Sequence, residues 1–470
     1  MSNDVSALFA RAARLASAYR EGLASRPPRP TIAPQDLLAR FDGPTPERGE
    51  DGAAVIEELA QAADPGLTGM AGPRFFGWVI GASHETGVAA DMLTSAWAQN
   101  AGMYAGTPAA AIAEKVAGDW LLDILRLPKE SSVGFVTGAT IANFVGLAAA
   151  RNEVLRRAGW DVEAKGLQGA PRVRVLIGAD AHTTVYASLR FLGFGAETAE
   201  PIATDDQGHM KADVLARALA QGEGPAIVVA QAGQINTGAF DPVGEIAKAC
   251  RAHGAWLHID GAFGLWARAV PEMAAMVDGL DQADSWATDG HKWLQLPYDC
   301  GLVFVRDREA HRRAMTIAAS YLPKGAEIEH DPSLYTPELS RRARGFAAWA
   351  VIKALGREGI AQMVRKHCAF ARRVAERVSK EPGIQVLNDV CLNQVIIAFG
   401  NGEIEQQNET TRAVIARLQE DNIVFAGGGA WRDRWVMRLS IISAPLTEAD
   451  IDRLGDAIVS AWRAVKEKQS

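Results

Sequence analysis

The chain has 470 residues, of which 48% are hydrophobic and 22% are charged, and its formal net charge at pH 7 is -7. This balance is typical of a globular protein and provides no basic surface for nucleic acid or an anionic membrane. The four cysteines include no Cys-x-x-Cys pair, which argues against a zinc site or a disulfide framework and suits a reducing cytoplasm. No stretch is long and apolar enough for a membrane span. We therefore expect a cytoplasmic protein with no metal, nucleic-acid or membrane partner.

The first 24 residues predict an amphipathic helix. Apolar side chains recur at helical spacing from Leu8 to Tyr19, and no continuous apolar run of a secretory signal is present. We interpret this helix as one that packs on the body of the protein or on a partner subunit. Its arginines leave a transit peptide open as the alternative. A proline-punctuated segment, residues 26–34, follows as a linker.

Alternating helices and apolar strands follow from about residue 70. The expected helices cover residues 108–126, 140–158 and 243–253, and the expected strands cover residues 173–179, 226–232, 255–260 and 301–305. Such alternation predicts an α/β fold whose mainly parallel sheet is covered by helices on both faces. After residue 336 the pattern changes to long helices and two apolar runs, which indicates a small α+β C-terminal domain. We therefore expect three segments: an N-terminal helical segment 1–69, a large domain 70–336 and a small domain 337–470.

Two short motifs carry the chemistry. Asp260 ends the strand-like run AWLHID, and Lys292 follows His291 in the run DGHKWLQLPYDCG. A lysine can form a Schiff base with an aldehyde, and a carboxylate at a buried strand end can keep a pyridine nitrogen protonated. Together the motifs indicate pyridoxal 5'-phosphate (PLP). Alone, an aspartate at the end of a strand, such as Asp260, is more often a helix cap or part of a surface turn.

Two further segments supply what PLP would need. In GFVTGATIAN, a strand-like run meets Gly138, and Thr140 opens a long helix whose free amides could bind a phosphate. An ordinary capped helix after a tight turn is the alternative. His182 follows the strand 173–179, where its ring could stack on the cofactor, although a lone loop histidine is often incidental.

The ordered set of motifs resembles the group II PLP-dependent amino-acid decarboxylases, the family of aromatic-L-amino-acid and glutamate decarboxylases. The similarity runs from about residue 70 to residue 460. It includes GWVIGASHETGVAADML, the phosphate loop GFVTGATIANFVGLAAAR, ADAHTTV, HIDGAFG and DGHKWLQLPYDCG. The last two are the most specific.

The resemblance implies PLP fold type I, a homodimer with active sites at its interface, and decarboxylation of an L-amino acid to its amine. It implies that Lys292 binds the cofactor aldehyde, Asp260 pairs with the ring nitrogen and His182 stacks on the ring. The remaining implied cofactor-binding residues are Gly138, Ala139, Thr140 and His291 at the phosphate, Ala262 beneath the ring and Asn236 near its substituents.

The chain departs from the family in two loops. The phosphate loop TGATIAN is one residue shorter than usual and has Ile141 where the family has Glu. The family's mobile loop, which carries the tyrosine that protonates the product, corresponds to residues 318–338 and is also shorter. Tyr335 is our candidate for this catalytic tyrosine and Tyr321 the alternative, while a surface-packed loop tyrosine remains open for Tyr335. Loss of this tyrosine can divert such an enzyme toward oxidative or transaminating products.

Two residues bear on the substrate. Trp78 lies where the family lines its side-chain pocket, which favours an aromatic or apolar substrate, but a core role is equally open. Arg438 could bind a substrate carboxylate, or it could pair within the C-terminal domain. Other PLP chemistry on the same fold (aminotransferase or aldolase-type lyase) and a catalytically silent PLP-binding dimer are the alternative functions.

Overall fold

The structure is a computed structural model that describes residues 4–316 and 330–469, and it divides the chain into two compact units. The larger unit comprises Val79–Arg372 and Asn388–Val395, and the smaller unit comprises Met1–Trp78, Arg373–Leu387 and Ile396–Ser470. This division differs from the three segments expected at 1–69, 70–336 and 337–470. The N-terminal segment belongs with C-terminal residues because long-range contacts join them: Phe75 forms a β-bridge with Phe425, and Ser443 Oγ donates to the carbonyl of Gly72.

The larger unit contains a seven-stranded sheet with the strand order β1-β7-β6-β5-β4-β2-β3. The strands are β1 (Ser132–Val136), β2 (Arg174–Gly178), β3 (Ala199–Ile202), β4 (Ala226–Gln231), β5 (Trp256–Asp260), β6 (Ser285–Asp289) and β7 (Gly301–Val305). From β6 to β3 the neighbouring strands are parallel, whereas β7 runs antiparallel to both β6 and β1. The expected α/β fold with a mainly parallel sheet is confirmed.

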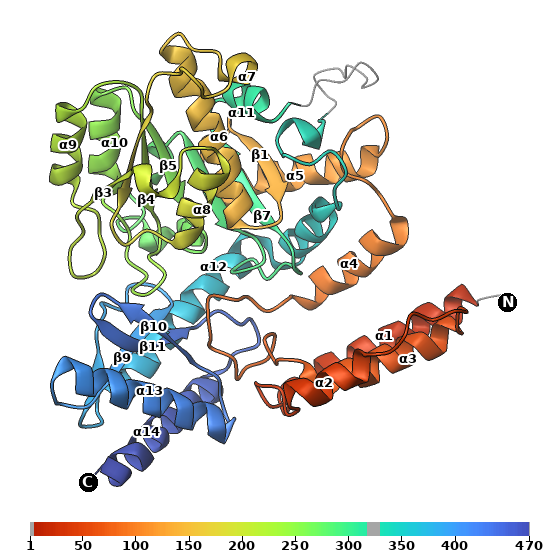
Figure 1. Cartoon of the computed structure of the whole chain (residues 1–470). Coiled ribbons are helices and arrows are strands. Elements are labelled where there is room, and N and C mark those ends of the chain that lie inside the picture. Colours follow the sequence, from red (N-terminus) through yellow and green to blue (C-terminus); the bar gives the residue numbers. More distant parts are fainter. Residues whose placement is uncertain (1–3, 317–329, 470) are drawn as a thin grey trace. The chain divides into compact units, whose positions relative to one another are not determined.

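Helices precede, connect and follow these strands (Figure 1). They are α4 (Glu85–Trp97), α5 (Pro108–Ile124), α6 (Ala139–Arg157), α7 (Val162–Lys165), α8 (Thr183–Phe191), α9 (Ala212–Gln221), α10 (Val243–Ala252) and α11 (Arg308–Met315), followed by α12 (Arg344–Val378), which has a kink at Gly356. The crossovers through α6 and α8 advance along the sheet in one direction, and those through α9 and α10 return in the other. Because such crossovers are right-handed, the two pairs of helices cover opposite faces of the sheet.

Helix α6 forms the centre of one layer. It packs against β5, β6 and β7 and against the neighbouring helices α8 and α11. Small and branched side chains such as Ala142, Val145 and Ala149 are fully buried in this layer. Its N-terminus is therefore held rigidly at the edge of the sheet where the parallel strands end.

The smaller unit contains a four-stranded sheet with the order β10-β11-β9-β8. Its elements are α1 (Val5–Gly22), α2 (Pro34–Phe41), α3 (Gly52–Ala63), β8 (Ile384–Val386), β9 (Gln394–Phe399, which begins in the larger unit), α13 (Ile404–Asp421), β10 (Gly427–Trp431), β11 (Arg434–Ser440) and α14 (Glu448–Gln469). The glycine run at 427–429, readable from sequence as a loop or a turn, is part of strand β10, which pairs antiparallel with β11. None of the described helices is long and apolar enough to cross a membrane.

Candidate active site

A cavity of about 300 Å³ lies in the larger unit at the carboxyl ends of the parallel strands. Strands β5 and β6 end in Asp260 and Asp289, and the turn after β6 carries Lys292. The other residues used below that line it are Gly138, Ala139, Thr140, His182, Thr184, Ala262, His291 and Tyr298. The cavity therefore collects polar groups from distant parts of the chain at one end of the sheet.

Asp289 lies between the lysine and the first turn of α6. Its Oδ2 atom is 2.9 Å from Lys292 Nζ, and its Oδ1 atom accepts the backbone N–H of Ala139 at 2.6 Å. The side chain of Asp289 is only 4% exposed. A buried carboxylate thus holds the lysine amine at the base of the cavity and contacts the N-terminus of α6.

Asp260 is the second buried carboxylate. One of its oxygens accepts the N–H of Ala262 at 3.2 Å, and burial raises the pKa of Asp260, with His182 and Lys292 opposing that rise. A carboxylate in such a position would be stabilised by a protonated ring nitrogen. Asp260 therefore has the burial and the chemistry that a pyridinium partner requires.

His182 caps helix α8. Its Nδ1 atom accepts the backbone N–H of Thr184 at 3.3 Å and lies 2.7 Å from the Thr184 hydroxyl. Because Nδ1 is the acceptor, the neutral ring carries its proton on Nε2. The cap fixes the orientation of an imidazole that lines the cavity near Asp260.

His291 and Tyr298 form the wall next to Lys292. Their rings stack with centroids 4.3 Å apart, and His291 Nδ1 accepts the N–H of Cys300 at 3.1 Å. Burial lowers the pKa of His291, while burial together with Asp289 raises the pKa of Tyr298 to about 12. At neutral pH Tyr298 is therefore a protonated phenol that can donate a hydrogen bond.

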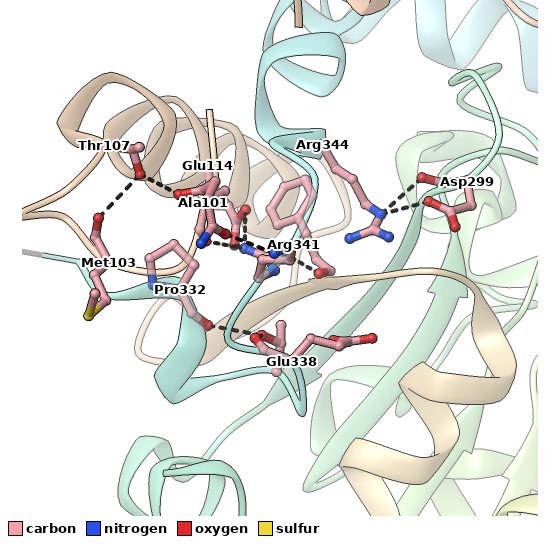
Figure 2. Close-up of polar contacts among 12 residues, drawn as sticks. Ala101, Met103, Thr107, Glu114, Asp299, Pro332, Glu338, Arg341 and Arg344 are labelled. Carbon is pink, nitrogen blue, oxygen red and sulfur yellow. Dashed lines mark hydrogen bonds and ion pairs between the residues drawn. The ribbon is translucent and has the colours of Figure 1, made fainter. Parts of the chain in front are cut away.

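The position of Tyr298 is secured from helix α12. Arg344 Nε donates to the carbonyl oxygen of Asp299 at 3.1 Å and to its carboxylate at 2.8 Å, as Figure 2 shows. The arginine side chain is 8% exposed. This contact holds the residue that follows Tyr298 in place.

Glycine is required where the main chain crosses the lysine turn. A Cβ atom on Gly81 would lie 2.0 Å from the carbonyl oxygen of Lys292. A Cβ atom on Gly301 would lie 2.4 Å from the backbone of Gly138. At both positions two backbone segments approach each other more closely than a residue with a side chain would allow.

The structure brings together most of the residues that the sequence indicates. Lys292, Asp260, His182, Gly138, Ala139, Thr140, His291 and Ala262 all line the cavity. Asn236 does not line the cavity, although the preceding residue, Ile235, does. Asn236 is buried, and its backbone N–H donates to Gln234 Oε1 at 2.6 Å. Its proposed position near the ring substituents is not supported within this chain.

Tyr335 does not line this cavity either. It packs against His330 and His311, with ring centroids 5.3 and 5.2 Å away, and its carbonyl oxygen lies 3.0 Å from His311 Nε2. Burial raises the pKa of Tyr335. A catalytic role for Tyr335 in the cavity of its own chain is therefore not supported, and the alternative, Tyr321, lies outside the described residues.

Trp78 and Arg438 belong to the smaller unit. Trp78 packs on Phe75 and Phe425, with ring centroids 5.8 and 5.4 Å away. Arg438 lies in β11, where burial lowers its pKa. Their roles in substrate binding stay predictions.

Sequence reasoning missed Asp289 and Tyr298 as site residues. Both lie near the His291–Lys292 pair in the chain, and this proximity is the only sequence feature that could have indicated them as site residues. Which of the neighbouring side chains faces the cavity depends on strand β6 and on the turn after it, and the sequence pattern did not show that strand. His258, in the HID motif, instead bonds Asn143 and Ser285 in the core.

The donor set fits PLP. A lysine amine, a buried carboxylate, an oriented imidazole and the N-terminus of a long helix line one cavity. These groups match in turn an aldehyde, a pyridinium nitrogen, an aromatic ring face and a phosphate.

Comparisons with known proteins agree with this assignment. Residues 34–399 match the model of the pyridoxal-dependent decarboxylase conserved domain. Aromatic-L-amino-acid decarboxylase from Cavia porcellus is 29% identical over 96% of this chain and 94% of its own length, and 4-hydroxyphenylacetaldehyde synthase from Rhodiola rosea is 26% identical over 96% and 91%. The crystal structure of Oryza sativa TDC with PLP and tryptamine has the same fold, with a TM-score of 0.92, 24% identity and coverage of 99% of this chain and 98% of that one. The chain therefore belongs to the pyridoxal-dependent decarboxylase family and is a PLP-dependent enzyme of fold type I.

Proposed function

We propose that this enzyme decarboxylates an L-amino acid with an aromatic side chain to the corresponding amine and carbon dioxide. The observation that carries the proposal is the alignment of nearly the whole chain with relatives named for aromatic substrates, including tryptophan decarboxylase 1 of Oryza sativa at 26% identity. The site described above supplies the groups that this reaction needs. A phenol and two histidines in the cavity suit an aromatic side chain.

Each residue has a separate task in this proposal. PLP, when bound, supplies an electron sink for the bond broken at the substrate's α-carbon. Lys292 binds the cofactor through Nζ and later moves protons at the same atom. Asp260 holds the proton on the ring nitrogen, and His182 keeps the ring flat. Ala139 and Thr140 offer backbone amides to the phosphate at the N-terminus of α6.

Aldehyde formation is the second candidate reaction. Two observations favour it: Tyr335 does not line the cavity of its own chain, and two relatives, from Rhodiola rosea and Arabidopsis thaliana, are named as aldehyde synthases. In this reaction dioxygen is the oxidant and water supplies the aldehyde oxygen: one substrate, one dioxygen and one water give aldehyde, carbon dioxide, ammonia and hydrogen peroxide. The proton donor at the α-carbon decides between the two outcomes.

Product analysis tests both reactions. Purified PLP-loaded enzyme would be incubated with aromatic, acidic and basic L-amino acids, and amine, aldehyde and hydrogen peroxide would be measured. We expect amine from an aromatic substrate, and no product from Lys292→Ala with any of them. Aldehyde and peroxide in place of amine would support the second reaction, and keto acid without carbon dioxide would contradict both.

Two tyrosine variants identify the proton donor. Tyr298→Phe and Tyr335→Phe each remove one hydroxyl and keep the aromatic ring. If Tyr335 acts in the cavity of a second copy of the chain, Tyr335→Phe raises the ratio of aldehyde to amine and Tyr298→Phe does not. The reverse result would assign the role to Tyr298, whose phenol lines the cavity.

We further propose a homodimer with active sites at its interface. Large apolar side chains are exposed together around a groove of about 400 Å³ on α4, α5 and α12, including Leu93, Trp97, Ile112 and Trp349. Apolar groups gathered in this way commonly mark a protein interface. Light scattering should give twice the 50.2 kDa chain mass, and a monomer at micromolar concentration would contradict the dimer.

A further inference from the structure

We propose that Asp289 is an internal competitor for the cofactor phosphate: its carboxylate occupies the N-terminus of α6 and weakens the binding of PLP. This inference holds for any amino-acid substrate, so it does not depend on the proposed reaction.

The geometry places the carboxylate at the anion site. Asp289 Oδ1 accepts the Ala139 N–H at 2.6 Å, lies 3.4 Å from His291 Nε2 and would lie 3.5 Å from a Cβ atom on Gly138. Ala139 and His291 are the groups that we assign to the phosphate. Two of the groups assigned to the phosphate thus contact a negative side chain of the same chain.

The carboxylate is not needed to position the main chain. The backbone N–H of Asp289 donates to the carbonyl of Ala262 at 2.9 Å, and Trp266 Nε1 donates to the carbonyl of Asp289 at 3.0 Å. These contacts, together with the β6 ladder, hold the residue whatever its side chain. An asparagine has the same shape, and its amide oxygen can still accept the Ala139 N–H.

Binding of PLP must therefore change the environment of Asp289. The phosphate is a dianion, and it would lie beside a buried carboxylate whose nearest positive partner is Lys292. Like charges a few ångströms apart in a buried site repel strongly, so the carboxylate opposes the phosphate.

The test compares PLP with pyridoxal, which has the aldehyde but lacks the phosphate. Dissociation constants for both would be measured on cofactor-free wild type and on Asp289→Asn by the visible absorbance of the bound cofactor. Effects through Lys292 are common to both aldehydes, so the ratio of the two dissociation constants reports the contribution of the phosphate group to binding. Glu130→Gln is the control, because it removes one negative charge from an exposed residue that does not line the cavity.

We expect Asp289→Asn to strengthen PLP binding about tenfold or more relative to pyridoxal, and Glu130→Gln to leave the ratio unchanged. Inorganic phosphate, titrated calorimetrically into the cofactor-free protein, should also bind more tightly to Asp289→Asn. An unchanged ratio, or PLP binding weakened relative to pyridoxal, would overturn the proposal and make Asp289 part of the phosphate cradle. Circular dichroism and the melting temperature check folding first, and Asp289→Ser provides a second neutral side chain if asparagine is not tolerated.

Discussion

A deeply buried ion pair of the larger unit joins Glu114 on α5 to Arg341. Both side chains are 1% exposed, and Arg341 Nη1 lies 3.0 and 2.8 Å from the two carboxylate oxygens. The same guanidinium donates to the carbonyl of Ala101, as Figure 2 shows, and to the carbonyl of Phe135. Because Phe135 belongs to β1, which leads into the turn at Gly138, this arginine also supports the phosphate end of the cavity.

Glu114→Gln should be strongly destabilising. Burial raises the pKa of Glu114 and Arg341 opposes that rise, so each charge depends on the other. Removing one partner of such a pair leaves an uncompensated buried charge and costs about 3–5 kcal/mol. For a unit of about 300 residues this corresponds to a decrease in melting temperature of roughly 5–8 °C. Replacing both partners with apolar residues, Glu114→Leu with Arg341→Met, should recover most of the loss.

Calorimetry on the cofactor-free protein measures these differences. The control is Glu130→Gln, which breaks an exposed pair with Arg306 whose atoms are 3.5 Å apart and should cost less than about 1 kcal/mol. Equal losses for Glu114→Gln and Glu130→Gln would refute the reasoning. A double variant as unstable as Glu114→Gln would show that the lost hydrogen bonds, including those from Arg341 to the two carbonyls, and not the unpaired charge, set the cost.

Two further predictions follow from the core and the lysine turn. Burial lowers the pKa of His258 to about 3, so the unfolded chain binds this proton first as the pH falls. The contribution of His258 to the free energy of unfolding should therefore decrease by about 5 kcal/mol between pH 6.5 and pH 3. In urea titrations across that range His258→Gln should lose less stability than wild type, and an identical slope would contradict the assignment. Gly81→Ala should reduce attachment of PLP to Lys292, measured by mass spectrometry after borohydride reduction, because its Cβ would meet the lysine carbonyl. Gly106→Ala, whose nearest neighbour would be 3.9 Å away, is the control, and equal attachment in the two variants would contradict the steric argument.

Local pattern was sufficient for much of the fold. Apolar runs bounded by helices predicted β2, β4, β5 and β7, because a buried strand between two helices has a distinct composition. The antiparallel direction of β7 could not be read in this way, since direction depends on which strands become neighbours. The grouping of residues 1–78 with the C-terminal elements likewise depends on pairings between residues hundreds of positions apart, such as Phe75 with Phe425.

The same distinction applies to the site. Lys292, Asp260 and His182 could be recognised from the sequence because each adjoins a strand end, and the ends of parallel strands meet at one edge of a sheet. Tertiary structure alone decided that Asp289 reaches both Lys292 and the first turn of α6, and that Tyr335 packs away from the cavity. Sequence specifies which chemical groups a short motif carries. Which of those groups face one another is decided by packing between distant segments, because a side chain's direction depends on the neighbours that its backbone acquires on folding.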